Sequence, residues 1–133
     1  MILPNKSVPH IVRATAALTS SYVAGTVVGI DEANMIGIQV TYVKGDETSL
    51  EMKVESSIDG GTTFGQQVTQ TAVGGTVTLT PGIYSMTAAS AAATQIFNFI
   101  INPIKGDQIK ISFKATGGTP TGTVACKAIT GWV

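Results

Sequence analysis

The chain has 133 residues, enough for one domain with a core of its own. Its net charge is zero, and charged residues make up only 12 %, about half of the usual share. Capture of nucleic acid or anionic lipid requires a basic face, so this balance argues against both partners. A sparsely charged surface is poorly protected against association and favours a protein that packs against other copies or partners.

The first ten residues contain Pro4 and Pro9 and show no hydrophobic period. Proline disfavours helix at its own position and at the one before it. We therefore expect an extended N-terminal arm over residues 1–10 and a single domain over residues 11–133. The arm is either a frayed terminus or a segment that docks on a neighbour. We expect no signal peptide and no membrane span, because no apolar run has the required flanks or length.

Two short apolar runs follow, at residues 11–18 and 22–30. The alanines of the first run permit a short helix, whereas the second run favours a strand. The acids at 31–32 mark a turn. Residues 35–43 then alternate between apolar and other side chains, and this period of two predicts a strand.

The clearest strand signal spans residues 48–57. Leu50, Met52 and Val54 fall on one face, and Glu51, Lys53 and Glu55 fall on the other. Such alternation is typical of a strand with one buried face and one solvated face. Residues 44–47 predict a hairpin turn before this strand. The glycines at 60–61 predict a reversing loop after it, because glycine readily adopts positive φ.

The rest of the chain repeats this pattern. We expect further strands near residues 64–71, 76–80, 83–87, 95–102, 109–114 and 121–130. Residues 88–93 are small and predict a helical turn or a flat loop. Residues 95–102 are the most apolar and predict a central strand with both faces buried. Turn signals every 8–12 residues predict an all-β, antiparallel β-sandwich of about eight strands, and two four-stranded sheets would make it a jelly roll.

The sequence offers little catalytic chemistry, and we expect no enzyme. His10 is the only histidine, the residue type most often used as a general base, and it lies in the predicted arm, where a base is poorly held against its target. Cys126 alternates with apolar residues and is expected to be a buried structural thiol rather than a nucleophile. The chain contains no nucleotide-binding, zinc-protease or serine-hydrolase motif.

Several acids occupy predicted turns, and in a sandwich they would need to converge on one rim to bind Ca²⁺. Their spacing matches no calcium loop, and turn acids more commonly cap backbone amides. We therefore expect no cofactor and no metal. The repeated Lys-Gly-Asp tripeptides at 44–46 and 105–107 are predicted to be hairpin turns, with an adhesion motif as the less typical alternative.

Four motifs occur in a fixed order. They are V-x-Y-x-K-G-D-x-T-S-L-x-x-K-V-E-x-S-x-D-G-G-T-T-F at 40–64, P-G-x-Y at 81–84, K-G-D-x-I-K-I-x-F at 105–113 and T-G-T at 121–123. This order resembles the capsid decoration, or cement, proteins of tailed bacteriophages, over most of residues 24–133. Phe64 stands where that family often has tryptophan. The resemblance implies a homotrimeric jelly roll on the capsid surface of the virion, made in the host cytoplasm, with an arm that reaches neighbouring subunits and the major capsid protein as partner.

The first hypothesis is therefore a structural virion protein that stabilises a phage head through subunit contacts. The expected contact residues are Ile2, Leu3, Pro4, Val8 and Pro9 in the arm, Ala88, Ala89, Ala91 and Ala92 in the small-residue segment, and Trp132 and Val133 at the C-terminus. The alternative is a glycan- or host-binding sandwich module of a phage tail or capsid surface. That function requires exposed aromatic rings, for which Tyr84 and Trp132 are the candidates.

Overall fold

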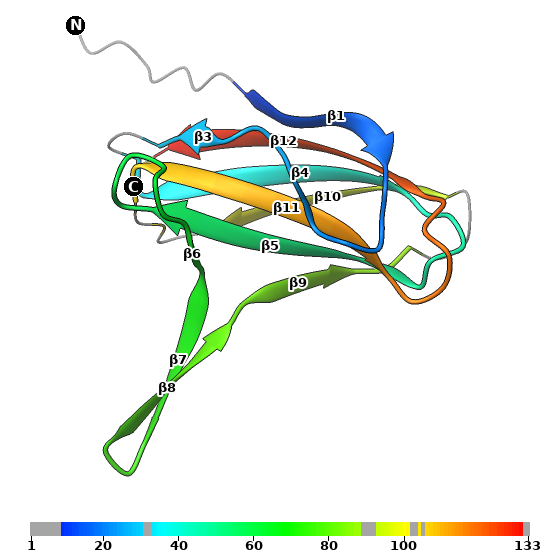
Figure 1. The fold of residues 1–133 in the computed structure, drawn as a ribbon. Coiled ribbons are helices and arrows are strands. Elements are labelled where there is room, and N and C mark those ends of the chain that lie inside the picture. Colours follow the sequence, from blue (N-terminus) through cyan, green and yellow to red (C-terminus); the bar gives the residue numbers. More distant parts are fainter. Residues whose placement is uncertain (1–8, 31–32, 89–92, 102–103, 105, 132–133) are drawn as a thin grey trace, which may run out of the picture.

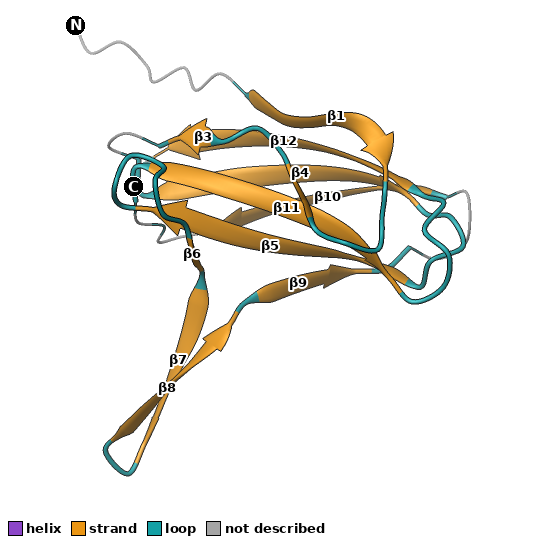
Figure 2. Cartoon of the chain, in the orientation of Figure 1, coloured by secondary structure: helices purple, strands orange, loops and turns teal. Residues whose placement is uncertain are grey.

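The computed structural model describes residues 9–30, 33–88, 93–101, 104 and 106–131. Every regular element among these residues is a strand (Figure 2). The strands are β1 (His10–Ala17), β2 (Val23–Ala24), β3 (Val28–Gly29), β4 (Met35–Val43), β5 (Ser49–Ser57), β6 (Gly65–Gln66), β7 (Val68–Val73), β8 (Thr76–Pro81), β9 (Ile83–Met86), β10 (Thr94–Ile101), β11 (Gln108–Thr116) and β12 (Thr123–Gly131).

Two antiparallel sheets form the body of the molecule (Figure 1). Sheet A has the strand order β1-β12-β4-β10. In sheet B, β11 pairs with β2 and β3 on one side and with β5 on the other, and β5 also pairs with β6 and β9. If β2 with β3 and β6 with β9 each count as one interrupted strand, the orders become 1-8-3-6 and 2-7-4-5, the arrangement of a jelly roll.

The predicted antiparallel β-sandwich is therefore confirmed. The prediction of about eight strands matches the eight positions of the two sheets. The structure has twelve separate strands because two positions are interrupted and because β7 and β8 form an additional hairpin.

The core lies between the two sheets and follows directly from the period of two. Alternate residues of β4, Ile36 to Tyr42, and of β5, Leu50 to Val54, are almost completely buried. Alternate residues of β11 and β12 complete the same interior. Each sheet therefore contributes one apolar face to the core and presents its other face outward.

The helix considered for residues 11–18 is wrong, because this segment forms β1 and pairs with β12. Alanine permits a helix, but backbone pairing with an adjacent strand overrides that weak local preference. His10, placed in the arm from the sequence, is the first residue of β1. Residues 1–8 of the predicted arm lie outside the described part of the chain.

The prediction of a central strand with two buried faces at residues 95–102 is also wrong. This segment is β10, the last strand of sheet A, and β4 is its only partner strand among the described residues. Its outward side chains Ile96 and Ile100 are 56 % and 63 % exposed. An apolar run alone does not distinguish a central strand from an edge strand with an apolar outer face.

The tripeptides at 44–46 and 105–107 do not form hairpin turns. Each lies in a connection that crosses between sheets, since β4 and β10 belong to sheet A whereas β5 and β11 belong to sheet B. Gly45 is needed for close approach, because a side chain there would collide with Thr121 and Gly122. In the second tripeptide Gly106 has φ 140° and Lys105 lies outside the described residues.

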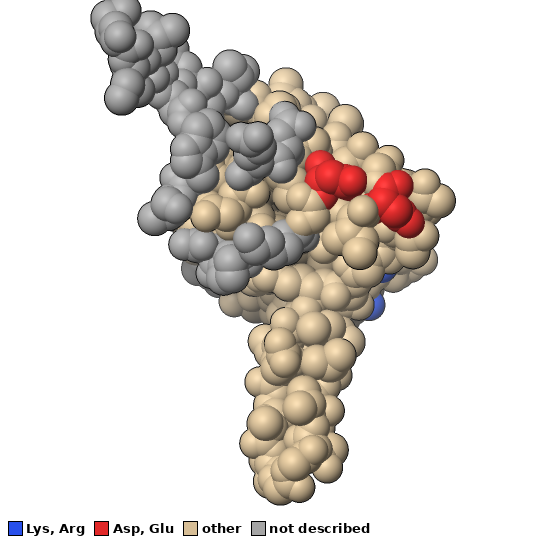
Figure 3. Space-filling model, turned by 90° about the vertical axis from the view of Figure 1, so that its left-hand side faces the viewer, with Lys and Arg blue, Asp and Glu red and all other residues tan. Residues whose placement is uncertain are grey.

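β7 and β8 pair only with each other and project from the sandwich (Figures 1 and 3). All twelve of their residues are exposed. The predicted strand at 64–71 is accordingly divided into the short β6, which pairs with β5, and the longer β7 in this hairpin. An isolated two-stranded hairpin is only marginally stable in water.

Glu47 joins two of the loops at one end of the sandwich. Its side chain is 0 % exposed and accepts hydrogen bonds of 2.8 Å from the backbone N–H groups of Gly45 and Gly122. The carboxyl group thereby links the connection after β4 to the segment before β12.

Replacing Glu47 with alanine is expected to destabilise the fold strongly. The change leaves the buried N–H of Gly122 and the partly buried N–H of Gly45 without their acceptor, at roughly 1–3 kcal/mol for a buried group. Asp46→Ala is the matched control, because Asp46 is the exposed neighbour and surface changes usually stay within about 0.5 kcal/mol. Chemical denaturation measures both variants, and equal midpoints would contradict the structural role of Glu47.

Candidate functional site

The outer face of sheet B carries five of the seven charged residues that lie in strands. Lys53 and Lys110 lie 3.5 Å and 3.9 Å from the carboxyl oxygen Oε1 of Glu55, and Lys114 lies 3.5 Å from Oε2 of Glu51. These pairs alternate in sign across β5 and β11. Each is partly exposed and contributes roughly 0.2–1 kcal/mol at most. Such a face is well solvated and has its charges paired within the chain.

Tyr22 completes this charged face. Its hydroxyl donates a 3.1 Å hydrogen bond to Glu51, and the ammonium groups of Lys53 and Lys114 each lie 4.8 Å from the centre of its ring. Burial, followed by the hydrogen bond to Glu51, raises the pKa of Tyr22 to about 12. The phenol therefore stays neutral at physiological pH and covers the polar side chains around it.

The outer face of sheet A has the opposite character. Lys127 is the only charged residue in the whole of β4, β10 and β12. The exposed aliphatic side chains on this side of the molecule are Ile11, Ile96, Ile100 and Ile129. Exposed apolar side chains gathered on one face commonly mark a protein interface.

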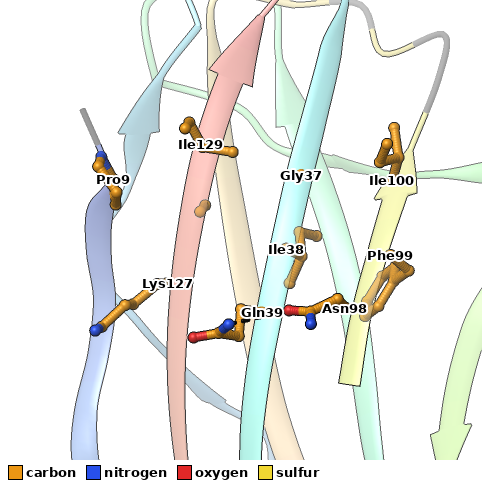
Figure 4. Close-up of a pocket in the computed structure, with 10 residues that line it drawn as sticks. Pro9, Gly37, Ile38, Gln39, Asn98, Phe99, Ile100, Lys127 and Ile129 are labelled. Carbon is orange, nitrogen blue, oxygen red and sulfur yellow. Dashed lines mark hydrogen bonds between the residues drawn. The ribbon is translucent and has the colours of Figure 1, made fainter. Parts of the chain in front are cut away.

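A groove crosses this face at Gly37 (Figure 4). Gly37 of β4 is paired with Ile129 of β12 on one side and with Ile100 of β10 on the other, so two isoleucines flank a position without a side chain. The hollow has a volume of 570 Å³. Glycine within a strand is unfavourable and often marks close approach by another group.

Two of the polar side chains of the groove pair with each other. Gln39 Nε2 donates a 3.1 Å hydrogen bond to Asn98 Oδ1, across the β4–β10 pair. The groove therefore offers an apolar contact surface with an amide pair beside it. We name this surface, with Gly37 at its centre, the Gly37 groove.

The projecting hairpin has two chemically different faces. Its register places residues of β7 and β8 opposite one another, so directly paired residues share a face. One face holds mostly apolar residues, namely Val68, Gln70, Ala72, Val77, Leu79 and Pro81. The other holds five threonines and a valine, namely Thr69, Thr71, Val73, Thr76, Thr78 and Thr80. We call these the apolar face and the threonine face of the hairpin.

Residues 68–81 contain no charged side chain, and Figure 3 shows the hairpin as an uncharged projection from the body. Val77 and Leu79 on the apolar face are 57 % and 59 % exposed. The positive-φ glycines Gly74 and Gly75 form the tight turn at its tip. The hairpin thus presents a neutral surface, apolar on one side, away from its own core.

Two of the contact residues expected from the sequence lie in the described part of the chain. Pro9 lines the Gly37 groove, beside the start of β1. Ala88 is partly buried and packs against the core, so it is not a free contact surface. The remaining ones, Ile2, Leu3, Pro4, Val8, Ala89, Ala91, Ala92, Trp132 and Val133, lie outside the described residues.

The groups considered for catalysis are not brought into a reactive arrangement. His10 is exposed at the start of β1. Cys126 is buried, as predicted, and burial raises the pKa of its thiol to about 12. No group of three or more His, Cys, Asp or Glu residues that would hold a metal occurs among the residues that the structure describes, nor does a helix that would span a membrane.

The prediction that turn acids cap backbone amides is confirmed for three of them. Asp59 accepts hydrogen bonds from the Ser57 hydroxyl and the Thr63 N–H, and Asp107 accepts one from the Gly60 N–H. Glu47 has the corresponding role in the loop after β4. The hydrogen bond from Thr63, followed by that from Ser57, lowers the pKa of Asp59.

The sequence analysis missed the hairpin and the groove as interaction surfaces. The signal was present, since residues 76–81 alternate threonine with Val77, Leu79 and Pro81. Alternation predicts a strand with two different faces, but it does not show whether the apolar face covers the chain's own core. Gly37 was likewise visible within an otherwise apolar strand.

No family model and no curated protein matches the chain. Among solved structures, the chain is similar to the crystal structure of the SPBc2 prophage-derived protein YomS. The two share 14 % sequence identity and a TM-score of 0.44, over 98 % of this chain and 99 % of YomS. A likeness of this degree identifies neither a family nor a function.

The raised pKa of Cys126 predicts a thiol that is inert in the native chain. The thiolate is the reactive form of cysteine, and the pKa of an unperturbed cysteine thiol is about 8.5. At pH 8, labelling by a charged, water-soluble thiol reagent is expected to be at least roughly tenfold slower in the native chain than in the same chain unfolded in guanidinium. Equal labelling rates would contradict the burial of Cys126.

Proposed function

We propose that the chain is a structural virion protein of the capsid decoration class, which stabilises a phage head by binding across its subunits. The observation that carries the proposal is the division of the surface between a charged, internally paired face on sheet B and partly apolar surfaces with little or no charge on sheet A and the hairpin. A protein that works by permanent association needs such neutral contact surfaces, whereas its solvent side needs charge.

The choice of partner is supported by the motif order between Val40 and Phe64 and by the later P-G-x-Y and K-G-D motifs, which resemble decoration proteins. The jelly-roll order of the two sheets agrees with that resemblance. On this basis we propose the major capsid protein as partner, a homotrimer as the bound form, and the capsid surface as its location. The arm, with Ile2, Leu3 and Val8, is the proposed contact to the head.

The proposed mechanism is passive. A protein that binds the assembled shell and not its dissociated subunits stabilises the shell by mass action, by about 2.7 kcal/mol per site at a hundred times the dissociation constant. This mechanism requires no acid–base pair, and we propose that the chain has no catalytic activity. The exposed His10 and the buried Cys126 are consistent with that role.

Glycan binding is the weaker alternative. Sugar recognition commonly uses an open aromatic ring, but the described aromatics are at least partly buried. Tyr84 stacks on Phe99 with 5.5 Å between ring centres, and Lys110 lies 4.5 Å from the centre of the Phe64 ring. Trp132 lies outside the described residues. Robust binding on a glycan array would favour this alternative over the decoration role.

Removal of residues 1–9 is expected to weaken binding to heads without unfolding the sandwich, because β1 begins at His10. The test mixes purified chain with expanded heads of a phage from which its gene has been deleted, and measures the fraction that sediments with them. The full-length chain is expected to saturate the heads, and the shortened chain to bind at least roughly tenfold more weakly, a difference of about 1.4 kcal/mol.

Lys53→Gln serves as the control for this experiment. Lys53 lies on the charged outer face of sheet B, which we propose faces solvent, so the variant is expected to bind heads like the full-length chain. Failure of the full-length chain to sediment with the heads would contradict the proposed function. If the shortened chain bound heads with full affinity, the arm would not contribute to the contact with the head.

A further inference from the structure

Among the described residues, nothing covers the apolar face of the hairpin. Within that part of the chain β7 and β8 pair only with each other, and Val77 and Leu79 are more than half exposed. Figure 1 shows the hairpin extending away from the sandwich, so its tip cannot lie on its own sheet A. A two-stranded hairpin with an exposed apolar face gains stability when that face is covered.

The outer face of sheet A also presents exposed apolar side chains. The Gly37 groove is apolar and carries Lys127 as its only charged residue. Its walls, Ile100 and Ile129, are exposed at 63 % and 39 %. Natural sheets usually protect an exposed edge with charge, but β10, the edge strand beside the groove, contains none.

We propose that the hairpin of one copy lies on the Gly37 groove of a second copy of this chain, with its apolar face against sheet A. Two sheets can pack face to face in this way, with interdigitated side chains and about 10 Å between them. The Cγ2 methyl of Ile129 lies 3.0 Å from where a Cβ of Gly37 would be, so a projecting residue such as Leu79 would pack in the groove between Ile129 and Ile100. The inference deepens the proposed function by naming the contact between copies of the chain.

Charge and size both support a second copy as the occupant. Residues 68–81 carry no charge, so they bury no ionic group of their own against a groove in which Lys127 is the one charged lining residue. The apolar face of the hairpin contributes six residues and the groove ten lining residues. A copy that uses both surfaces therefore approaches the roughly 20–30 residues that one side of a stable interface contains. Contact between two hairpins through their apolar faces would use only six residues on each side.

The test places a lysine on each surface and measures the molar mass of the full chain by light scattering over a wide range of concentration. Leu79→Lys introduces a charge on the apolar face, and Ile100→Lys introduces one on the wall of the groove. Both sites are exposed, so the fold is expected to survive. The unmodified chain is expected to associate, and each variant to associate at least tenfold more weakly.

Thr78→Lys is the matched control. It adds the same charge to the same strand, next to Leu79, but on the threonine face of the hairpin. This variant is expected to associate like the unmodified chain. Equal weakening by Thr78→Lys and Leu79→Lys would overturn the assignment of the apolar face, and thermal unfolding of each variant checks that the sandwich is intact.

Mixing the two variants distinguishes docking on the groove from contact between hairpins. Leu79→Lys keeps an intact groove, and Ile100→Lys keeps an intact hairpin. An equimolar mixture is therefore expected to regain association, through the hairpin of the Ile100→Lys variant on the groove of the Leu79→Lys variant. An Ile100→Lys variant that associates like the unmodified chain would overturn the inference, because hairpins would then be binding elsewhere.

The outcomes also separate this inference from the proposed function. An unmodified chain that stays monomeric at all concentrations overturns the inference, even if it sediments with phage heads and thereby supports the proposed function. A chain that associates through Leu79 and Ile100 but ignores heads supports the inference and contradicts the function. Loss of head binding by Leu79→Lys in a chain that is always monomeric would assign the apolar face to the head instead.

Discussion

The structure depends on the packing of two inward-facing rows of apolar side chains, one row from each sheet. Successive residues of a strand point to opposite sides, so burial of alternate positions in β4, β5, β11 and β12 fixes which residues point outward. The outward set differs sharply between the sheets. Sheet B presents Glu51, Lys53 and Glu55 on β5, whereas sheet A presents mainly neutral and aliphatic side chains around Gly37. A shift of one residue in register would reverse this division, so the core determines the functional character of both surfaces.

The two surfaces with little or no charge, on sheet A and on the hairpin, explain the unusual composition of the chain. Most of the charged residues described lie on sheet B and in loops, where Glu47, Asp59 and Asp107 satisfy backbone N–H groups. Surfaces without charge are unfavourable for a protein that stays free in solution, because they promote association. For a protein that acts by associating, the same surfaces provide the binding free energy. The proposed virion role and the proposed contact between copies both follow from this single feature.

Much of the fold was predictable from the sequence, because local alternation of apolar and polar residues determines the strands. β4 and the strand containing Leu50 were predicted within one residue of their bounds. The positive-φ loop at Gly60 and the burial of Cys126 were also predicted. The errors concern relations between distant segments. The sequence of β10 shows that it is apolar but not that it lies at an edge, and the segments around Gly45 and Gly106 show a turn but not that it crosses between sheets. The hairpin was missed as a surface because alternation shows two faces without showing what covers them.

Hydrogen exchange of the backbone amides, compared between the dissociated and the assembled chain, tests the central claim most directly. The account predicts that assembly slows exchange in residues 68–81 and in β10, because the uncharged surfaces become buried between subunits. It predicts no change in the exchange rates of the amides of β5 and β11, because the charged outer face of sheet B remains in solvent. Protection that appears on β5 and β11 while the hairpin and β10 exchange as before would contradict the account.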